Sequence, residues 1–212
     1  MQWTLVIPLK PLARAKSRLA DTAADAVRPG LALAFAQDTV AAALACPAVA
    51  DVAVVTDDEL AGRELAALGA RIVPDAPGSG LNAALTHGAD VVREMRPRTP
   101  VAALNADLPA LRPLELSRVL NAAAEFPRAF LPDAAELGTT LLAAAPDHAL
   151  RPVFGTDSRA RHRTSGAAEL RLTGVDSVRQ DVDTGEDLRA ALALGVGPHT
   201  AAVSARLLIP GS

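Results

Sequence analysis

The sequence predicts a single α/β domain over residues 1–212, built on a mostly parallel, doubly wound sheet with an added β-hairpin region. Three observations predict this class. Short apolar runs typical of buried strands alternate with longer helix-forming segments up to residue 125. The segments between these runs are long enough for the helical crossovers that parallel strands require. The chain has 212 residues, of which 50% are hydrophobic and 21% charged, and this suits one domain with its own core.

The first part of the chain predicts the parallel strands and their helices. Strands are expected where short runs of Val, Ile, Leu and Ala stop at or near a proline or an aspartate: 3–7, 51–56, 71–73 and 101–105. Helices are expected in the segments between and after them: 29–45, 59–68, 81–94 and 113–124. Gly69 is positioned to end the second helix.

After residue 125 the pattern changes. Two strand-like runs, 128–133 and 139–145, are separated by Gly138 and predict the added hairpin. An Arg-rich polar segment over 151–165 follows, and Ser158 is expected to open a helix there. The remaining expected elements are a strand at 170–175, a helix at 184–194 and an edge strand at 203–209.

Composition and charge exclude several classes of protein. The apolar content is too high for a disordered chain, and no fixed period suggests a fibrous or repeat protein. The run before Pro8 is too short for a signal peptide, and no run approaches the ~20 apolar residues of a membrane span. A net charge of −3 and 2% aromatic residues argue against nucleic-acid binding. Cys46 is the single cysteine, so we expect a cytoplasmic protein without disulfides. From the apolar runs, charge and aromatic content above, we expect neither a membrane nor a nucleic-acid partner.

The lysines are unusual, because the chain has 19 arginines but only two lysines. Lys10 and Lys16 follow the first strand, and residues 1–20 contain four cations and no acid. Ligands of open α/β sheets bind at the carboxyl ends of strands, where such cations suit a polyphosphate. A solvated basic loop is the alternative. Neither a Walker pattern nor G-x-G-x-x-G follows this strand, which disfavours P-loop and dinucleotide-binding folds.

Acidic residues follow the fourth strand and recur near the end of the chain. Asp107 is a candidate Mg²⁺ ligand, because Mg²⁺ commonly takes one or two carboxylates together with substrate phosphates. The alternative is that Asp107 caps the next helix. Asp181 and Asp183 would lie on one side of an extended segment, whereas Thr184 and Asp187 match a helix cap. Both interpretations can hold for different residues.

Two polar segments between these acids could bind an anion. One contains Gly138 and the two threonines after it. In the other, a glycine precedes Ser158, and arginines 159, 161 and 163 follow, so backbone N–H groups, a hydroxyl and cations would surround an anion. His162 is expected to be structural or to pair with an anion, not to act as a general base. The sequence shows no zinc pattern and no G-x-S-x-G nucleophile motif.

An ordered set of motifs makes a family resemblance specific. The motifs are Pro8-x-Lys10-x5-Lys16-Ser17-Arg18-Leu19, Val55-Thr56-Asp57-Asp58, Gly80-Leu81-Asn82, Asn105-Ala106-Asp107-Leu108-Pro109, Gly138-Thr139-Thr140, Phe154-Gly155-x2-Ser158-x3-His162 and Asp181-Val182-Asp183-Thr184. Over residues 3–190 they resemble the phosphoenolpyruvate/2-phospho-L-lactate guanylyltransferases of coenzyme F-420 biosynthesis. The resemblance implies a GT-A-like nucleotidyltransferase fold, of the nucleotide-diphospho-sugar transferase type. It also implies transfer of GMP from GTP to phosphoenolpyruvate or 2-phospho-L-lactate, with release of diphosphate.

The same resemblance implies roles for individual residues. The implied catalytic residues are Lys16, Asp107 and Asp183. Asp107 and Asp183 would hold Mg²⁺, with Asp181 as a third carboxylate. The implied nucleotide-binding residues are Pro8, Lys10, Lys16, Asp57, Gly80, Asn82 and Asn105. The implied acceptor-binding residues are Thr140, Gly155 and Ser158. The implied partners are GTP, the phosphorylated acceptor and a downstream transferase that uses the unstable product, enolpyruvoyl-2-diphospho-5'-guanosine when phosphoenolpyruvate is the acceptor.

The chemistry of these residue types agrees with the implied reaction. Nucleotidyl transfer requires the α-phosphate to lie in line with the incoming phosphate oxygen, and the charge on the departing diphosphate to be neutralised. Mg²⁺ on two aspartates and two lysines on the polyphosphate would meet these requirements. The incoming phosphate monoester is already an anionic nucleophile, so no strong general base is needed.

Three other functions stay open at this point. The first is another nucleotidyltransferase of this fold, acting on a sugar phosphate or a molybdenum-cofactor precursor. The second is a nucleotide-binding module without catalysis, and the third is a GT-A glycosyltransferase, although Asp107 is not part of a D-x-D motif. The small, Arg-rich acceptor segment favours a compact polyanion. The Ala- and Arg-rich composition suggests an actinobacterial source, for which the resemblance favours phosphoenolpyruvate over 2-phospho-L-lactate.

Overall fold

The sheet is the centre of the fold. The computed structural model describes residues 1–14, 27–76 and 78–207, and in these residues seven strands form one sheet in the order β3-β2-β1-β4-β6-β5-β7. The strands are β1 (Trp3–Pro8), β2 (Val49–Val55), β3 (Arg71–Val73), β4 (Val101–Leu104), β5 (Arg128–Pro132), β6 (Thr139–Ala144) and β7 (Ala168–Glu169). Strands β1 to β4 are parallel, whereas β6 is antiparallel to both β4 and β5. The predicted mostly parallel sheet with an added hairpin is therefore confirmed.

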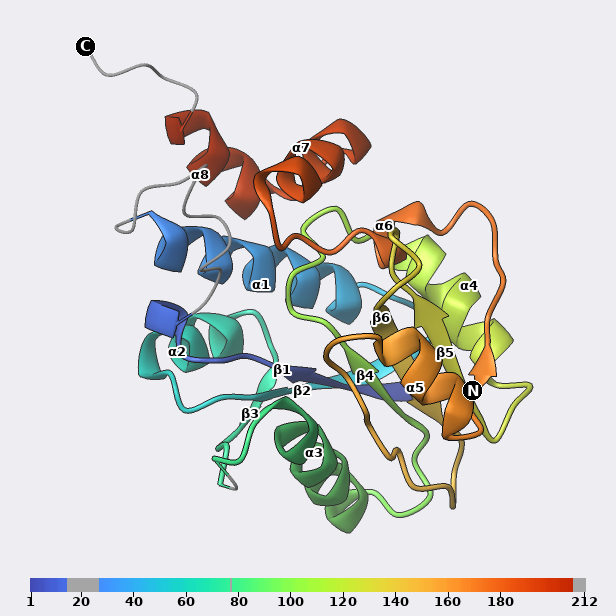
Figure 1. The fold of residues 1–212 in the computed structure, drawn as a ribbon. Coiled ribbons are helices and arrows are strands. Elements are labelled where there is room, and N and C mark those ends of the chain that lie inside the picture. Colours follow the sequence, from blue (N-terminus) through green and yellow to red (C-terminus); the bar gives the residue numbers. More distant parts are fainter. Residues whose placement is uncertain (15–26, 77, 208–212) are drawn as a thin grey trace.

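Helices cover both faces of the sheet. They are α1 (Arg28–Leu44), α2 (Glu59–Ala67), α3 (Leu81–Met95), α4 (Pro113–Ala123), α5 (Ser158–Thr164), α6 (Asp176–Arg179), α7 (Gly185–Leu194) and α8 (Pro198–Leu207), with a short 3-10 helix η1 (Leu12–Arg14). Figure 1 shows α1 on one side of the sheet and α3 on the other. The core clusters agree, because apolar residues of α1 and α4 pack on one face of β1 and those of α3 pack on the opposite face. This is the doubly wound arrangement that the sequence predicts.

The first strand shows why the sequence forms this fold. Trp3, Leu5 and Ile7 belong to the cluster under α1, whereas Val6 belongs to the cluster under α3. A strand buried on both faces is apolar throughout, because successive side chains point to opposite sides. On the α3 side, a Cβ at Gly88 would lie only 2.6 Å from a Val55 methyl carbon, so glycine permits the close approach of helix and sheet.

Two predicted strands are wrong. Only residues 168 and 169 pair with β5, and the predicted strand at 170–175 is irregular chain that leads into α6. Leu170 and Val175 are buried in the core cluster that also contains residues of α4. Their apolar side chains gave a strand-like pattern, although no strand forms there. The predicted edge strand at 203–209 is helical as far as residue 207, and residues 208–209 lie outside the described residues.

Cys46 is a buried free thiol, and burial raises its pKa, which makes it less reactive. No helix among the residues that the structure describes is long and apolar enough to cross a membrane.

Candidate active site

Three chain segments meet at the carboxyl end of β4. Asn105 follows β4 directly, and its backbone N–H donates to the Thr140 carbonyl at the start of β6 (3.0 Å). On the other side, the Val182 N–H donates to the Asp107 carbonyl (3.1 Å). The chain after α6 therefore returns to the strand end that the sequence predicts as the metal site, about 75 residues later in the sequence.

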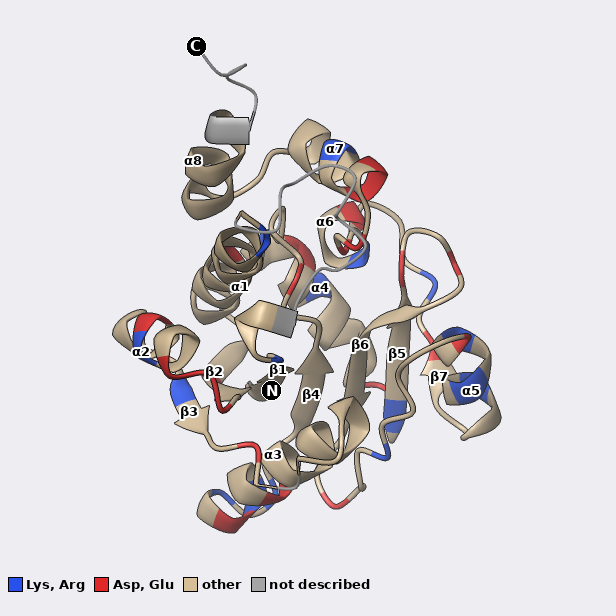
Figure 2. Cartoon of the chain, turned by 60° about the vertical axis from the view of Figure 1, so that its left-hand side comes forward, with Lys and Arg blue, Asp and Glu red and all other residues tan. Residues whose placement is uncertain are grey.

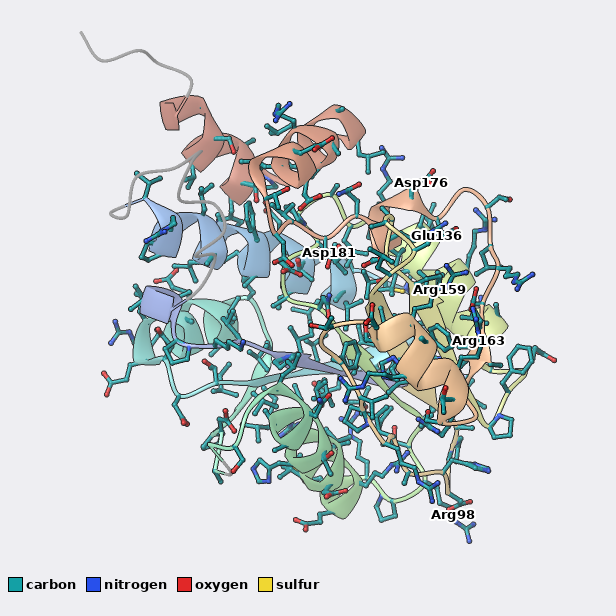
Figure 3. The ribbon with its side chains drawn as sticks, viewed as in Figure 1. Arg98, Glu136, Arg159, Arg163, Asp176 and Asp181 are labelled. Carbon is teal, nitrogen blue, oxygen red and sulfur yellow. The ribbon has the colours of Figure 1, made fainter. Side chains whose placement is uncertain are left out.

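This return brings together the segments that carry the predicted carboxylates. The side chain of Val182 is buried in a cluster with Leu31 and Phe35, which fixes the segment, and Asp181 and Asp183 flank it. The Asn105 side-chain amide donates to Asp181 Oδ2 at 3.3 Å. Asp107 and Asp181 are half-buried and Asp183 is exposed, and Figure 3 shows Asp181 in the segment that leads to α7.

The two capping interpretations have opposite outcomes. Asp107 does not cap the next helix, because α4 begins at Pro113 and its N-cap residue is Arg112. Thr184 and Asp187 do form a capping box at the start of α7. Asp187 Oδ2 also accepts the Asp183 N–H (3.1 Å), so the same box fixes the backbone of a proposed metal ligand.

The donor set fits Mg²⁺ only together with the substrate. No group of three or more acidic, histidine or cysteine side chains in the described part of the chain could hold a metal ion by itself. Asp107, Asp181 and Asp183 offer carboxylate oxygens, which are hard ligands. Mg²⁺ typically binds through one or two carboxylates and completes its octahedron with phosphates and water. These residues therefore suit a magnesium nucleotide better than a resident structural ion.

The three predicted acceptor residues come from two segments, the start of β6 and the chain that leads into α5. Thr140 lies at the start of β6, and its hydroxyl is fully buried with no hydrogen-bond partner among the described residues. Gly155 lies in the loop before α5 with φ +116°, a conformation that favours glycine. Ser158 opens α5 as predicted, is buried, and its hydroxyl lies 3.8 Å from the position of a Cβ on Gly138. The segments thus meet beside the start of β6.

His162 joins two of these segments. Its Nε2 accepts the Val153 N–H (3.1 Å), so Nδ1 carries the proton and donates to Thr139 Oγ1 (3.0 Å). The ring is fully buried and packs edge-on against Phe154. Burial, with Arg128 and Arg161 nearby, lowers the pKa of His162 to about 4. The expected structural role of His162 is confirmed, because both of its ring nitrogens bond to the protein.

Two of the three arginines of α5 are engaged by acids. Arg159 pairs with Glu169 (2.8 Å) and Glu136 (3.2 Å), and Arg163 also pairs with Glu169. The hydrogen bond from Arg159 lowers the pKa of Glu169 to about 2. The expectation that all three arginines face an anion is therefore wrong for Arg159 and Arg163. Figure 2 shows basic residues on α5, and Figure 3 shows Arg159 beside Glu136.

Three of the predicted nucleotide-binding residues lie at the ends of β1 and β2. Pro8 ends β1 and Lys10 is exposed beyond it, whereas Lys16 lies outside the described residues. Asp57 follows β2, lines a hollow of about 550 Å³, and accepts the Asp75 N–H (2.9 Å).

Gly80 and Asn82 begin α3, where Gly80 has φ +98°. Both polar atoms of the Asn82 side chain bond to the Phe154 backbone. The sequence analysis missed this contact, since no local pattern links positions 72 residues apart.

Arg179 is a second residue that the sequence analysis missed. Its guanidinium donates to the Asp133 carbonyl (2.9 Å), and its own carbonyl accepts the Ala134 N–H (2.9 Å). Arg179 thereby ties the loop before Gly138 to the segment that carries Asp181. Only its position two residues before Asp181 hinted at such a role.

The fold resembles that of solved nucleotidyltransferases of the nucleotide-diphospho-sugar transferase type. A structure from Desulfovibrio desulfuricans G20 assigned to that group superposes with a TM-score of 0.65 at 16% identity, covering 99% of this chain and 100% of the other. A nucleotidyl transferase from Methanothermobacter superposes with a TM-score of 0.63 at 20% identity, covering 91% and 97%. At these identities the likeness is one of fold.

The chain belongs to the guanylyl transferase CofC-like family, whose model matches residues 3–208. A Streptomyces coelicolor relative named phosphoenolpyruvate guanylyltransferase is 79% identical over 211 residues, which cover 100% of both chains. A Thermomonospora curvata relative of the same name is 61% identical over 207 residues, covering 98% of this chain and 90% of the relative. The family resemblance inferred from the motifs is confirmed, and the protein is a nucleotidyltransferase enzyme.

Proposed function

We propose that this protein transfers GMP from GTP to phosphoenolpyruvate and releases diphosphate. The product would be enolpyruvoyl-2-diphospho-5'-guanosine, for coenzyme F-420 biosynthesis. Membership of the guanylyl transferase family and the activity named for close relatives support this reaction. The structural observation that supports it is the meeting of three segments at the end of β4: the chain with Asn105 and Asp107, the start of β6 with Thr140, and the segment of Asp181 and Asp183.

The nucleotide side of the proposed site consists of the residues after β1, β2 and β4. Asp107 and Asp183, with Asp181, would hold Mg²⁺, which when bound neutralises charge on the triphosphate. Lys10 and Lys16 would contact the triphosphate. Lys16, Asp107 and Asp183 remain the proposed catalytic residues. The other proposed nucleotide-binding residues are Pro8, Asp57, Gly80 and Asn105, whereas both polar side-chain atoms of Asn82 are already bonded to the Phe154 backbone.

The acceptor side would use three kinds of group. The Thr140 hydroxyl has no partner among the described residues, so a phosphate or carboxylate oxygen would satisfy it. Gly155 would let the backbone approach the acceptor closely. Ser158 would add a hydroxyl at the first turn of α5.

The reaction asks for positioning and charge neutralisation rather than acid–base catalysis. A phosphate oxygen of the acceptor attacks the α-phosphorus of GTP, and the bond to the bridging oxygen breaks as diphosphate leaves with its electron pair. The attacking oxygen is already ionised near pH 7, so the enzyme need not remove a proton. The buried, neutral His162 fits this scheme, since both of its nitrogens are occupied by structural hydrogen bonds.

We also propose that residues 1–212 form a single nucleotidyltransferase domain that acts in the cytoplasm. A downstream transferase that consumes the unstable product is its proposed partner. The test is a matrix of nucleotides (GTP, ATP, CTP) against acceptors (phosphoenolpyruvate, 2-phospho-L-lactate, a hexose 1-phosphate) with MgCl₂ and product identification by mass. We expect enolpyruvoyl-2-diphospho-5'-guanosine as the product with GTP and phosphoenolpyruvate. Preference for another acceptor, or no diphosphate release with any pair, would contradict the proposal.

A further inference from the structure

The loop that carries Gly155 is held by side chains from three other segments. At its start, Arg128 of β5 donates to the carbonyls of Leu150 (3.1 Å) and Arg151 (3.1 Å). In its middle, His162 of α5 accepts the Val153 N–H. At its end, next to Gly155, Asn82 of α3 binds the Phe154 backbone. Each of these hydrogen bonds restricts the backbone of the loop residue that it binds.

The contact of Asn82 is the most complete of the three. Its Oδ1 accepts the Phe154 N–H at 2.8 Å, and its Nδ2 donates to the Phe154 carbonyl at 3.1 Å. This pairing uses the amide as an extra strand would, satisfying both polar groups of one residue. The carbonyl of Phe154 also lies 3.5 Å from Arg161 Nη1.

From Phe154 the support reaches the proposed acceptor site in two short steps. Gly155 is the next residue, and its carbonyl accepts the Ser158 N–H (3.1 Å). The neighbouring Arg159 N–H donates to the Leu137 carbonyl (3.2 Å), which places the first turn of α5 beside the start of β6 and Thr140. A shift at Phe154 would therefore move Gly155 and Ser158 relative to Thr140.

We propose that Asn82 is a positioning residue for the acceptor: its side-chain amide fixes the Phe154 backbone and with it the Gly155–Ser158 half of the acceptor site. The proposal rests on the proposed guanylyl transfer to phosphoenolpyruvate. It differs from a direct role in reading guanine, because both polar atoms of the amide are engaged by the protein.

The test is the Asn82→Leu variant, which keeps the side-chain size and removes both hydrogen bonds. Asn82 is half-buried, so the variant is expected to fold. The KM for phosphoenolpyruvate should rise at least about fivefold, while the KM for GTP and the preference for GTP over ITP change less than about twofold. Asn121→Leu, the same change at an exposed position of α4, is the matched control and should leave every constant unchanged.

A second measurement does not depend on activity. The amide hydrogen of Phe154 should exchange slowly in the wild-type protein and much faster in Asn82→Leu, with unchanged exchange in the strands. An unchanged KM for phosphoenolpyruvate, a loss of GTP-over-ITP preference, or equal exchange at Phe154 in both proteins would overturn the proposal. If the wild type forms no product, the proposed function fails, and the exchange experiment still decides the role of Asn82.

Discussion

Thr140 is buried, and its hydroxyl has no hydrogen-bond partner among the described residues, so its possible roles in stability and in acceptor binding can be separated. We expect Thr140→Val to leave the melting temperature unchanged or to raise it, because an unpaired buried hydroxyl costs about 1–3 kcal/mol. The KM for phosphoenolpyruvate should rise about tenfold, since one hydrogen bond to a charged group is lost. Thermal unfolding and steady-state kinetics test both effects.

Thr139 supplies the matched control for that variant. Its hydroxyl accepts from His162, so Thr139→Val leaves a buried donor unpaired and should lower the melting temperature. A Thr140→Val protein that is destabilised like Thr139→Val, with an unchanged KM, would show that Thr140 serves only the packing of β6.

The charge of Asp107 is the second prediction at this scale. Asp107→Asn should lower kcat by at least about a hundredfold with an intact fold, because it keeps the shape and removes the negative charge that a metal nucleotide requires. Circular dichroism and turnover at saturating Mg²⁺ are the measurements. Asp90→Asn, at an exposed position of α3, should behave as the wild type. Near-normal turnover in folded Asp107→Asn would remove Asp107 from the metal site.

The buried neutral state of His162 predicts how stability depends on pH. Its pKa is lowered from 6.5 to about 4, so the unfolded chain binds a proton more readily than the folded one. The free energy of unfolding should fall as the pH drops through this window, by about 2 kcal/mol between pH 7 and 4.5. Glu169, with a pKa of about 2, loses its ion pairs mainly below this range.

Urea unfolding at pH 7, 5.5 and 4.5 measures the effect. His162→Gln keeps an oxygen where Nε2 accepts the Val153 N–H but has no titrating group. Its stability should therefore vary much less over the same range. Equal pH dependence in the two proteins would show that other groups dominate.

At the scale of elements, the start of α7 fixes one of the proposed metal ligands. Asp187 accepts the N–H groups of Asp183 (3.1 Å) and Thr184 (2.8 Å). Asp187→Ala should cost about 1 kcal/mol of stability, as loss of a helix cap does, and should lower kcat because Asp183 is no longer held. Glu186→Ala, at an exposed position of the same turn, is the control. A stability loss without a change in kcat would separate the cap from the site.

At the scale of the whole molecule, one carboxylate of α1 accepts hydrogen bonds from the start of α8. Asp38 of α1 is buried and accepts the N–H groups of His199 (3.1 Å) and Thr200 (2.8 Å). Figure 1 shows α8 beside α1. Asp38→Ala should lower the unfolding free energy by about 1–3 kcal/mol, since two helix N–H groups lose their acceptor, and should speed amide exchange in residues 198–205. Asp38→Asn keeps one acceptor oxygen and should have a smaller effect. Unchanged exchange in Asp38→Ala would contradict this docking.

The sequence by itself determined the strands, their helices and the class of fold. Buried parallel strands are continuous apolar runs, and turns and caps are local, so β1 to β4 and α1 to α4 are visible in short windows. The motif order also predicted the family. Asp107, Asp181 and Asp183 were likewise identified as candidate site residues, because residue types can be read from the sequence without knowing their contacts.

Only the tertiary structure decided which of these groups work together. The contact of Asn82 with Phe154 joins residues 72 positions apart. The contacts of Asp38 with the start of α8 join residues at least 161 positions apart. No local pattern encodes such contacts, because they depend on how the helices lie on the sheet. The wrong prediction of a strand at 203–209 has this origin. Residues 198–207 form a helix whose first N–H groups donate to Asp38 of α1, and the local sequence does not reveal that partner. The lowered pKa of His162 likewise depends on the tertiary structure, since its causes are burial and the nearness of Arg128 of β5 as well as Arg161 of its own helix.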